Sequence, residues 1–259
     1  MIFRAAFSEN LARPNFGQVR PGGLVEFEDN ELEADIGNPL LEPTSASNLD
    51  FSVEWYTGGI GVLSASFFYK DLDDFIVVAN VADRIDLTQF VGNATVDDAE
   101  VFQPINGESA EVSGLELAWT RQFENGLLLG FNATVTDTDA SIADRVEKIE
   151  LPGQSDTVWN AQVGYESGRF SFRTAATFRS ESLVEIEDLG DPLFDRFQDD
   201  HLQIDMSFKY RMSDQLELIF NAVNLTDEPF YVYYSSPRYN GQFEEYGRTY
   251  NFGLRYTPN

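Results

Sequence analysis

The sequence predicts an all-β fold, an antiparallel transmembrane β-barrel of about ten strands. Three observations favour this fold class. Segments of strand length alternate between apolar and polar side chains, short turn-like connections alternate strictly with long polar ones, and aromatic residues gather at both ends of the alternating segments. Together they are typical of a sheet with one face in an apolar medium.

The clearest alternation is HLQIDMSFKYR, residues 201–211. Its apolar side holds Leu202, Ile204, Met206, Phe208 and Tyr210, and its polar side holds Gln203, Asp205, Ser207, Lys209 and Arg211. A period of two over this length predicts a β-strand with one apolar and one polar face. The apolar side is expected to meet lipid and the polar side a barrel lumen.

The same pattern recurs along the chain. It is clear in residues 49–55, 115–119, 159–165 and 250–256, and looser in residues 3–7, 63–69, 127–135, 170–178 and 216–224. With 201–211 these segments make about ten strands, each near the roughly 9 to 11 residues that a tilted strand needs to cross a bilayer.

The connections alternate between two kinds. Tight turns rich in Gly, Asn, Ser and Asp are expected at 57–61, 124–126, 167–169 and 213–215. Long polar connections are expected at about 9–47, 71–111, 138–156, 180–200 and 226–248. This layout is typical of an outer-membrane barrel, with short turns on the periplasmic side and long loops outside.

Aromatic residues close the apolar faces of the strands. Trp55, Trp119, Tyr165, Tyr210 and Tyr256 precede a short turn or the end of the chain, and Tyr69, Trp159, Phe178 and Tyr250 lie near the long connections. Amphipathic rings prefer the level of the lipid headgroups. The first five residues are therefore predicted to form a membrane-interface belt.

Composition excludes several classes of protein. Seventeen Lys and Arg against 44 Asp and Glu give a net charge of -27, which argues against a nucleic-acid partner. The chain has no Cys, so disulfides and thiolate metal sites are excluded. No run approaches the roughly 18 apolar residues of a spanning helix. The start, MIFRAAFSEN, has no apolar core of a secretory signal, so either the chain stays in the cytoplasm or its real beginning is missing.

An ordered series of motifs resembles the C-terminal barrel of TonB-dependent receptors, a family of outer-membrane transporters. The motifs are FRAAFSENLARPNF (3–16), GNPLLEPTSASNLDFSVEWY (37–56), SASFFYKDLDDFI (64–76), VSGLELAWTRQF (112–123), LPGQSDTVWNAQVGYE (151–166), LELIFNAVNLTDEPFYVYY (216–234) and YGRTYNFGLRY (246–256). They run from one end of the chain to the other.

The resemblance implies a location in the outer membrane of a Gram-negative bacterium and the energy-coupled uptake of a scarce ligand, such as a ferric siderophore, cobalamin or an oligosaccharide. It also implies a plug inside a barrel of about 22 strands, through which the TonB complex acts. About ten strands, no plug domain and no signal peptide are expected here, so residues 1–259 are interpreted as the C-terminal part of such a barrel. The implied partners are outer-membrane lipid, the barrel-assembly machinery and the small-molecule ligand.

The best candidate for ligand contact is the aromatic segment 230–246, expected as an external loop. It carries Tyr231, Tyr233, Tyr234, Arg238 and Tyr239, whose flat apolar faces and polar tips suit sugars or aromatic chelates. The alternative is that these rings pack against neighbouring loops or the membrane surface.

No catalytic site, cofactor or metal site is predicted, and the protein is not expected to be an enzyme. His201 has acidic neighbours, but it is interpreted as a residue at the start of a strand near the outer rim. The run DTDASIAD (137–144) lacks the Gly and the final Glu of a calcium loop, so it and EIEDLGD (185–191) are expected to be solvated acidic segments.

Two other fold and function classes remain open from sequence alone. A complete ten-stranded barrel would be a small pore or adhesin, which the even strand count permits. A soluble β-sandwich would be a binding module whose apolar strand faces meet a protein core.

Overall fold

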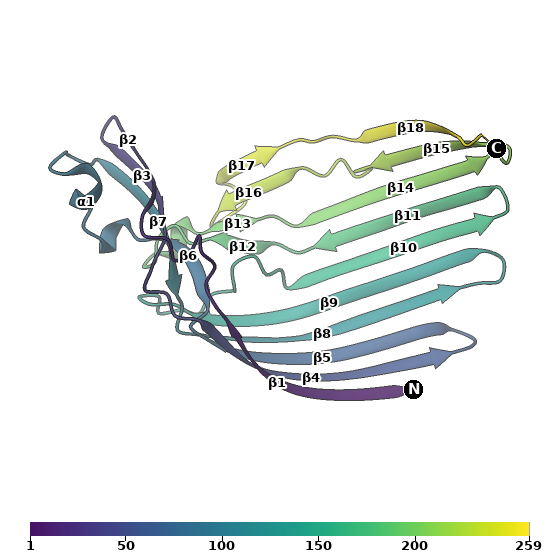
Figure 1. Ribbon diagram of the computed structural model, residues 1–259, viewed down its shortest axis with the longest axis horizontal. Coiled ribbons are helices and arrows are strands. Elements are labelled where there is room, and N and C mark those ends of the chain that lie inside the picture. Colours follow the sequence, from purple (N-terminus) through teal and green to yellow (C-terminus); the bar gives the residue numbers. More distant parts are fainter. Residues whose placement is uncertain (259) are drawn as a thin grey trace.

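The computed structural model describes residues 1–258. Its largest feature is one sheet of ten antiparallel strands in the order β1-β4-β5-β8-β9-β10-β11-β14-β15-β18 (Figure 1). The strands are β1 (Ile2–Ala12), β4 (Thr44–Thr57), β5 (Gly61–Asp73), β8 (Ser109–Gln122), β9 (Leu127–Ser141), β10 (Thr157–Ser167), β11 (Phe170–Arg179), β14 (His201–Arg211), β15 (Leu216–Val223) and β18 (Thr249–Tyr256). All ten predicted strands are confirmed.

The register confirms that each strand has two chemically different faces. Tyr210 of β14 lies opposite Phe170 of β11 and Leu218 of β15, whereas its neighbour Lys209 lies opposite Ser171 and Ile219. Residues that are directly opposite in a sheet share a face, so the apolar sides of neighbouring strands form one continuous apolar face. The opposite side of the sheet is called the polar face below.

Tight turns join the strands at one end of the sheet, and two of them depend on glycine. Gly61 and Gly126 have φ values of 91° and 90°, in the region that side chains with a Cβ rarely adopt. A Cβ on Gly126 would lie 1.9 Å from the carbonyl oxygen of Glu166, and one on Gly61 would lie 2.2 Å from that of Thr120. Glycine is therefore required where these turns touch the next strand.

The long connections at the other end are not simple loops. They contain two more sheets, one of β2 (Gly23–Glu28), β3 (Glu31–Ile36), β7 (Asp98–Asn106) and β6 (Ile76–Asn80), and one of β12 (Ser182–Glu185), β13 (Arg196–Gln198), β16 (Phe230–Tyr234) and β17 (Asn240–Glu244). They also contain η1 (Ala82–Arg84), α1 (Thr88–Val91) and η2 (Pro192–Phe194). We call these segments together the loop layer. Pairing is antiparallel except between β3 and β7.

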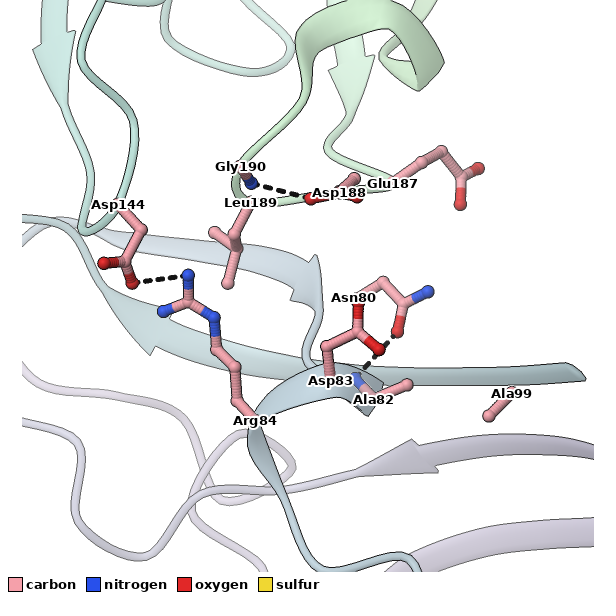
Figure 2. A pocket seen from close by; sticks show the side chains of 10 residues that line it. All are labelled: Asn80, Ala82, Asp83, Arg84, Ala99, Asp144, Glu187, Asp188, Leu189 and Gly190. Carbon is pink, nitrogen blue, oxygen red and sulfur yellow. Dashed lines mark hydrogen bonds and ion pairs between the residues drawn. The ribbon is translucent and has the colours of Figure 1, made fainter. Parts of the chain in front are cut away.

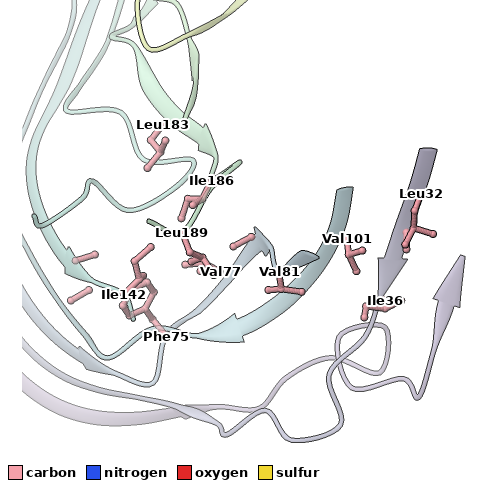
Figure 3. Packing of buried hydrophobic residues seen from close by; sticks show 14 residues of the cluster. Leu32, Ile36, Phe75, Val77, Val81, Val101, Ile142, Leu183, Ile186 and Leu189 are labelled. Carbon is pink, nitrogen blue, oxygen red and sulfur yellow. The ribbon is translucent and has the colours of Figure 1, made fainter. Parts of the chain in front are cut away.

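The buried hydrophobic core lies in this loop layer and not beneath the ten-stranded sheet (Figure 3). Leu32 and Val101 come from the first small sheet, and Leu183 and Ile186 come from the β12 region. Asn80 donates its backbone N–H to the carbonyl of Ile186 at 3.2 Å, next to a parallel bridge between Ala79 and Ile186. The two small sheets are therefore joined into one packed unit.

The loop layer also packs on the ten-stranded sheet. Ala110 of β8 and Ala140 of β9 belong to the same core, and they lie opposite each other on the polar face. The layer therefore folds over the polar face at the long-connection end of the strands. Figure 1 shows this layer at one end, with the start of β1 and the end of β18 at the other.

The ten-stranded sheet is open within residues 1–258. Strands β1 and β18 form its two edges and are not paired with each other. This differs from the complete ten-stranded barrel, which would close on itself. No helix of the described residues is long and apolar enough to cross a membrane.

Candidate functional site

The apolar face of the sheet is exposed at both edges and half-exposed on inner strands, as at Leu117 of β8 (44%) and Val163 of β10 (41%). Phe3 on β1 and Phe252 on β18 have exposed fractions of 74% and 84%. A groove of about 580 Å³ on this face is lined mainly by Phe and small apolar residues of β1, β4, β5 and β8. A face of this size without a second sheet packed on it is not that of a β-sandwich, and it indicates contact with lipid or with another protein.

The predicted belt residues lie on this face at the short-turn end of the strands. The rings of Tyr210 and Phe170 are 4.8 Å apart, and Trp119 donates its indole N–H to the carbonyl of Ile60 at 2.7 Å. Trp55, Tyr165 and Tyr256 have their rings on the same face, opposite Leu63, Leu127 and Leu216. Their contact with lipid headgroups stays a prediction.

The loop layer forms a polar cavity of about 690 Å³, partly open to solvent, where three of the long connections meet (Figure 2). Asn80, Asp83 and Arg84 come from the end of β6 and from η1, Asp144 from the connection after β9, and Glu187 and Asp188 from the connection after β12. Segments more than a hundred residues apart therefore supply its walls.

The cavity is predominantly acidic. Arg84 forms an ion pair of 2.5 Å with Asp144, and the two side chains point toward one another in Figure 2. Glu187 lies 3.7 Å from Arg196, which is not part of the cavity lining, and the carboxylates of Asp83 and Asp188 have no ion pair within residues 1–258. Burial, assisted by Glu185 and Glu100, raises the pKa of Glu187 to about 7. The cavity therefore favours cations or hydrogen-bond donors over anions.

A buried ion pair fixes the two connections behind this cavity. The side chains of Arg145 and Asp195 are only 3% and 4% exposed, and their closest atoms are 2.5 Å apart. Arg145 also donates to the backbone carbonyls of Asp188 and Leu189. Burial raises the pKa of Asp195, while the hydrogen bond from Arg145 opposes that shift. This arginine positions the chain that carries Asp188.

The aromatic segment 230–246 is a hairpin of β16 and β17 rather than an irregular loop. Tyr233 is buried, stacks on Phe197 at 5.9 Å and donates its hydroxyl to Glu181 at 2.5 Å. Burial raises the pKa of Tyr233. The Tyr231 hydroxyl donates to the carbonyl of Pro237, and the Tyr234 ring lies 5.6 Å from the guanidinium of Arg196.

The tip of the hairpin is different, because Arg238 and Tyr239 are exposed to solvent, Tyr239 by 62%. Among the five residues predicted for ligand contact, these two are free to meet a molecule arriving from solution. A contact of any of the five with a ligand stays a prediction.

Two acidic runs behave differently from the sequence expectation of solvated segments. Residues 137–141 lie in β9, with Thr138 and Ala140 buried and Asp139 exposed on the other face. In the run 185–191, Ile186 and Leu189 are core residues. The isolated apolar residues within each acidic run were the sequence signal for burial. That signal could have been used to infer that these runs belong to a packed layer.

No group of three or more His, Cys, Asp or Glu side chains in residues 1–258 is arranged to hold a metal ion. His201 begins β14, and its Nε2 lies 3.4 Å from Oε1 of Gln203. Its position at the start of a strand is as expected.

Comparison with solved structures finds large receptors of similar fold. A mutant ferric enterobactin receptor (PfeA) from Pseudomonas aeruginosa is 18% identical, with a TM-score of 0.64 over 97% of this chain and 37% of that chain. The siderophore receptor PirA from Acinetobacter baumannii is 16% identical (TM-score 0.65, 98% of this chain, 38% of that chain). The copper transporter OprC is 17% identical (TM-score 0.66, 98% and 36%). The chain thus spans little more than a third of each.

No curated protein matches the sequence. The family model described as TonB dependent receptor-like, beta-barrel matches residues 1–225, which include nine of the ten long strands. That match, with an open antiparallel sheet whose long connections all fold at one end, shows that the chain belongs to the TonB-dependent receptor β-barrel family.

Proposed function

We propose that this chain is the ligand-facing part of a receptor that takes up a scarce small molecule across the outer membrane. Members of this family are outer-membrane transport receptors of Gram-negative bacteria rather than enzymes. The observation that carries the proposal is the packed loop layer with its polar cavity of about 690 Å³ at the long-connection end of the sheet. A cavity of this size suits a small-molecule ligand.

The ligand is proposed to be a ferric siderophore, with cobalamin and an oligosaccharide as the other candidates. A bare copper ion fits this chain less well, because soft copper sites use thiolate, thioether or imidazole ligands. The chain has no Cys, one His and three Met. Exposed Arg238 and Tyr239 at the hairpin tip are proposed as the first contacts, since a guanidinium and a phenol ring together suit an aromatic chelate.

The other partners follow from the surface of the sheet. The exposed apolar face would contact outer-membrane lipid, and the barrel-assembly machinery would insert the strands. The TonB complex would act through a plug inside the barrel and not through residues of the apolar face.

Uptake in cells tests this proposal. A receptor gene that carries this chain together with a plug and further barrel strands is expressed in a Gram-negative host without its own siderophore, cobalamin and oligosaccharide receptors. Radiolabelled ferric siderophores, cobalamin and oligosaccharides are then supplied to cells with and without TonB. We expect that only the cells with TonB take up one of the ligand classes, and that the protein is found in the outer-membrane fraction. Equal passage of all solutes with and without TonB would instead indicate a passive pore.

A further inference from the structure

Two nitrogen-bearing side chains face each other on the polar face directly beneath the loop layer. Arg179 is the last residue of β11 and His201 is the first residue of β14, and the register places them opposite each other. Both are on the same face as Gln203 and Lys209, which is the face over which the loop layer folds. They therefore lie where a ligand passing from the loop layer would meet the wall of the sheet.

Arg179 has no carboxylate partner in residues 1–258. The described ion pairs include Arg145 and Arg196, the other arginines withdrawn from solvent near the β12–β13 region, but not Arg179. Its one side-chain hydrogen bond goes from Nη1 to Oε1 of Gln198 at 2.9 Å. What sets Arg179 apart from Arg145 and Arg196 is that it is half-buried and its one described side-chain partner is neutral. Most of the five N–H donors of this guanidinium are therefore free.

A half-buried guanidinium without a counter-charge is unfavourable, because part of its hydration is lost and nothing replaces it. An anionic oxygen supplies that replacement, and guanidinium groups bind such oxygens with two parallel hydrogen bonds. The imidazole of His201 lies on the adjacent strand with its Nε2 3.4 Å from Oε1 of Gln203, and when the ring carries both protons its Nδ1 offers a further N–H donor.

From this geometry we propose that Arg179 and His201 form an anion-binding subsite on the polar face, which takes the carboxylate or catecholate oxygens of the transported ligand. This inference rests on the proposed uptake function and names the ligand chemistry within it. The acidic cavity of the loop layer disfavours anions, whereas a negatively charged group at this subsite would meet a guanidinium that has no carboxylate partner within residues 1–258.

The neutral contact with Gln198 suggests a competing role, in which Arg179 only anchors β13 to the sheet. The two roles have different consequences. If Arg179 were only an anchor, removing Arg179 or removing Gln198 would weaken the attachment of β13 to the sheet equally. An anion subsite depends on the guanidinium and not on Gln198.

Binding by the full chain in detergent micelles tests the subsite, with quenching of tryptophan fluorescence as the readout. The probes are a ferric tris-catecholate, which is anionic, and a ferric linear trihydroxamate with a free amine, which is cationic. We expect Arg179→Gln to weaken the anionic probe about tenfold to a hundredfold, since a hydrogen bond to a charged group is lost. His201→Gln should weaken it less, and Arg179→Lys should retain part of the affinity.

Two variants serve as controls. Arg173→Gln lies on the same strand and face, toward the short turn, where Arg173 already pairs with Glu166 at 2.8 Å. It should leave the affinity for the anionic probe unchanged, as should Gln198→Ala. Heat-modifiable migration of each variant shows that the sheet is formed.

The subsite is overturned if Arg179→Gln binds the anionic probe with the same affinity as the unmodified chain, or if Gln198→Ala loses as much affinity as Arg179→Gln does. It is also overturned if the unmodified chain does not prefer the anionic probe over the cationic one. Absence of binding by both probes would overturn it too. None of these results contradicts uptake of a neutral or cationic ligand in the TonB-dependent assay, so a failure of the subsite is distinguishable from a failure of the proposed function.

Discussion

Replacing Arg145 by methionine should open the loop layer while leaving the ten-stranded sheet intact. Methionine has a similar length and keeps the packing volume, but it leaves the carboxylate of Asp195 buried without its partner. It also removes the hydrogen bonds to the carbonyls of Asp188 and Leu189. The connections after β9 and β12 would therefore lose the contact that holds them together.

The magnitude follows from the burial of the pair. With side chains only 3% and 4% exposed, solvent cannot replace the lost partner. Removing one member of a buried pair costs about 3 to 5 kcal/mol. Arg84, whose ion pair with Asp144 is 35% and 64% exposed, is the matched control in the same layer, and Arg84→Met should cost no more than about 1 kcal/mol.

Amide hydrogen exchange measures the opening at the affected connections. The reporting amides are those of Asn80, Ile149 and Gly153, which donate to Ile186, Ala140 and Leu183. Because 1.4 kcal/mol is about tenfold in an equilibrium, their exchange should accelerate by about a hundredfold to a few thousandfold in Arg145→Met. The amides shared by β10 and β11 should be unaffected, since local opening does not require the sheet to unfold.

A double substitution completes the test. Arg145→Met together with Asp195→Leu removes the unpaired charge, and it should recover most of the lost protection because a buried pair can often be replaced by apolar residues. Exchange in Arg145→Met within threefold of the Arg84→Met control would refute the reasoning. So would a double variant as fast as Arg145→Met alone, which would assign the effect to lost packing.

Three further predictions concern other parts of the molecule. The raised pKa of Glu187 means that the folded loop layer binds this proton more tightly than the unfolded chain does. The stability that protonated Glu187 contributes is therefore full below about pH 4.5 and is lost as the pH rises to about 7. Amide exchange in the loop layer, corrected for intrinsic rates, should be faster at pH 8 than at pH 5, and Glu187→Gln should reduce that difference. Leu183→Ala should destabilise the layer by about 2 to 5 kcal/mol, because Leu183 is 2% exposed in its core, and no change in exchange at Gly153 would contradict this. Leu117→Arg on the apolar face should destabilise the protein in a bilayer by about 2 to 4 kcal/mol and weaken its heat-modifiable band in the outer-membrane fraction. Ala118→Arg on the polar face should leave that band unchanged, and an equal loss of the band in both variants would argue against lipid contact.

The ten long strands were predictable because their signal is local. The segment 201–211 was expected as a strand and is β14 with the same bounds. Strands β8 and β9 extend further than expected, to Ser109 and Ser141. Their extra residues include Glu111 opposite Asp139, which carries no apolar alternation, so the sequence pattern ended before the hydrogen-bonded ladder does.

The candidate site was much less predictable. The strands of the loop layer are short, and the parallel pairing of β3 with β7 joins Leu32 to Ala99 across a long stretch of chain. Leu32, Ala34 and Ile36 do alternate within β3, but acidic residues separate them and the run resembles a solvated loop. Tyr233 could be recognised as a candidate from its chemistry, yet its burial depends on Phe197 and Glu181, which lie in other connections.

The sequence by itself determined the ten strands, their two faces and the separation of short turns from long connections, because a period of two and a tight turn are properties of neighbouring residues. Only the tertiary structure decided that the long connections pack into one layer, that Arg145 pairs with Asp195, and that Arg179 faces His201 with no carboxylate partner among residues 1–258. Those contacts depend on which segments meet in space, and burial and charge pairing are set at that meeting and not along the chain.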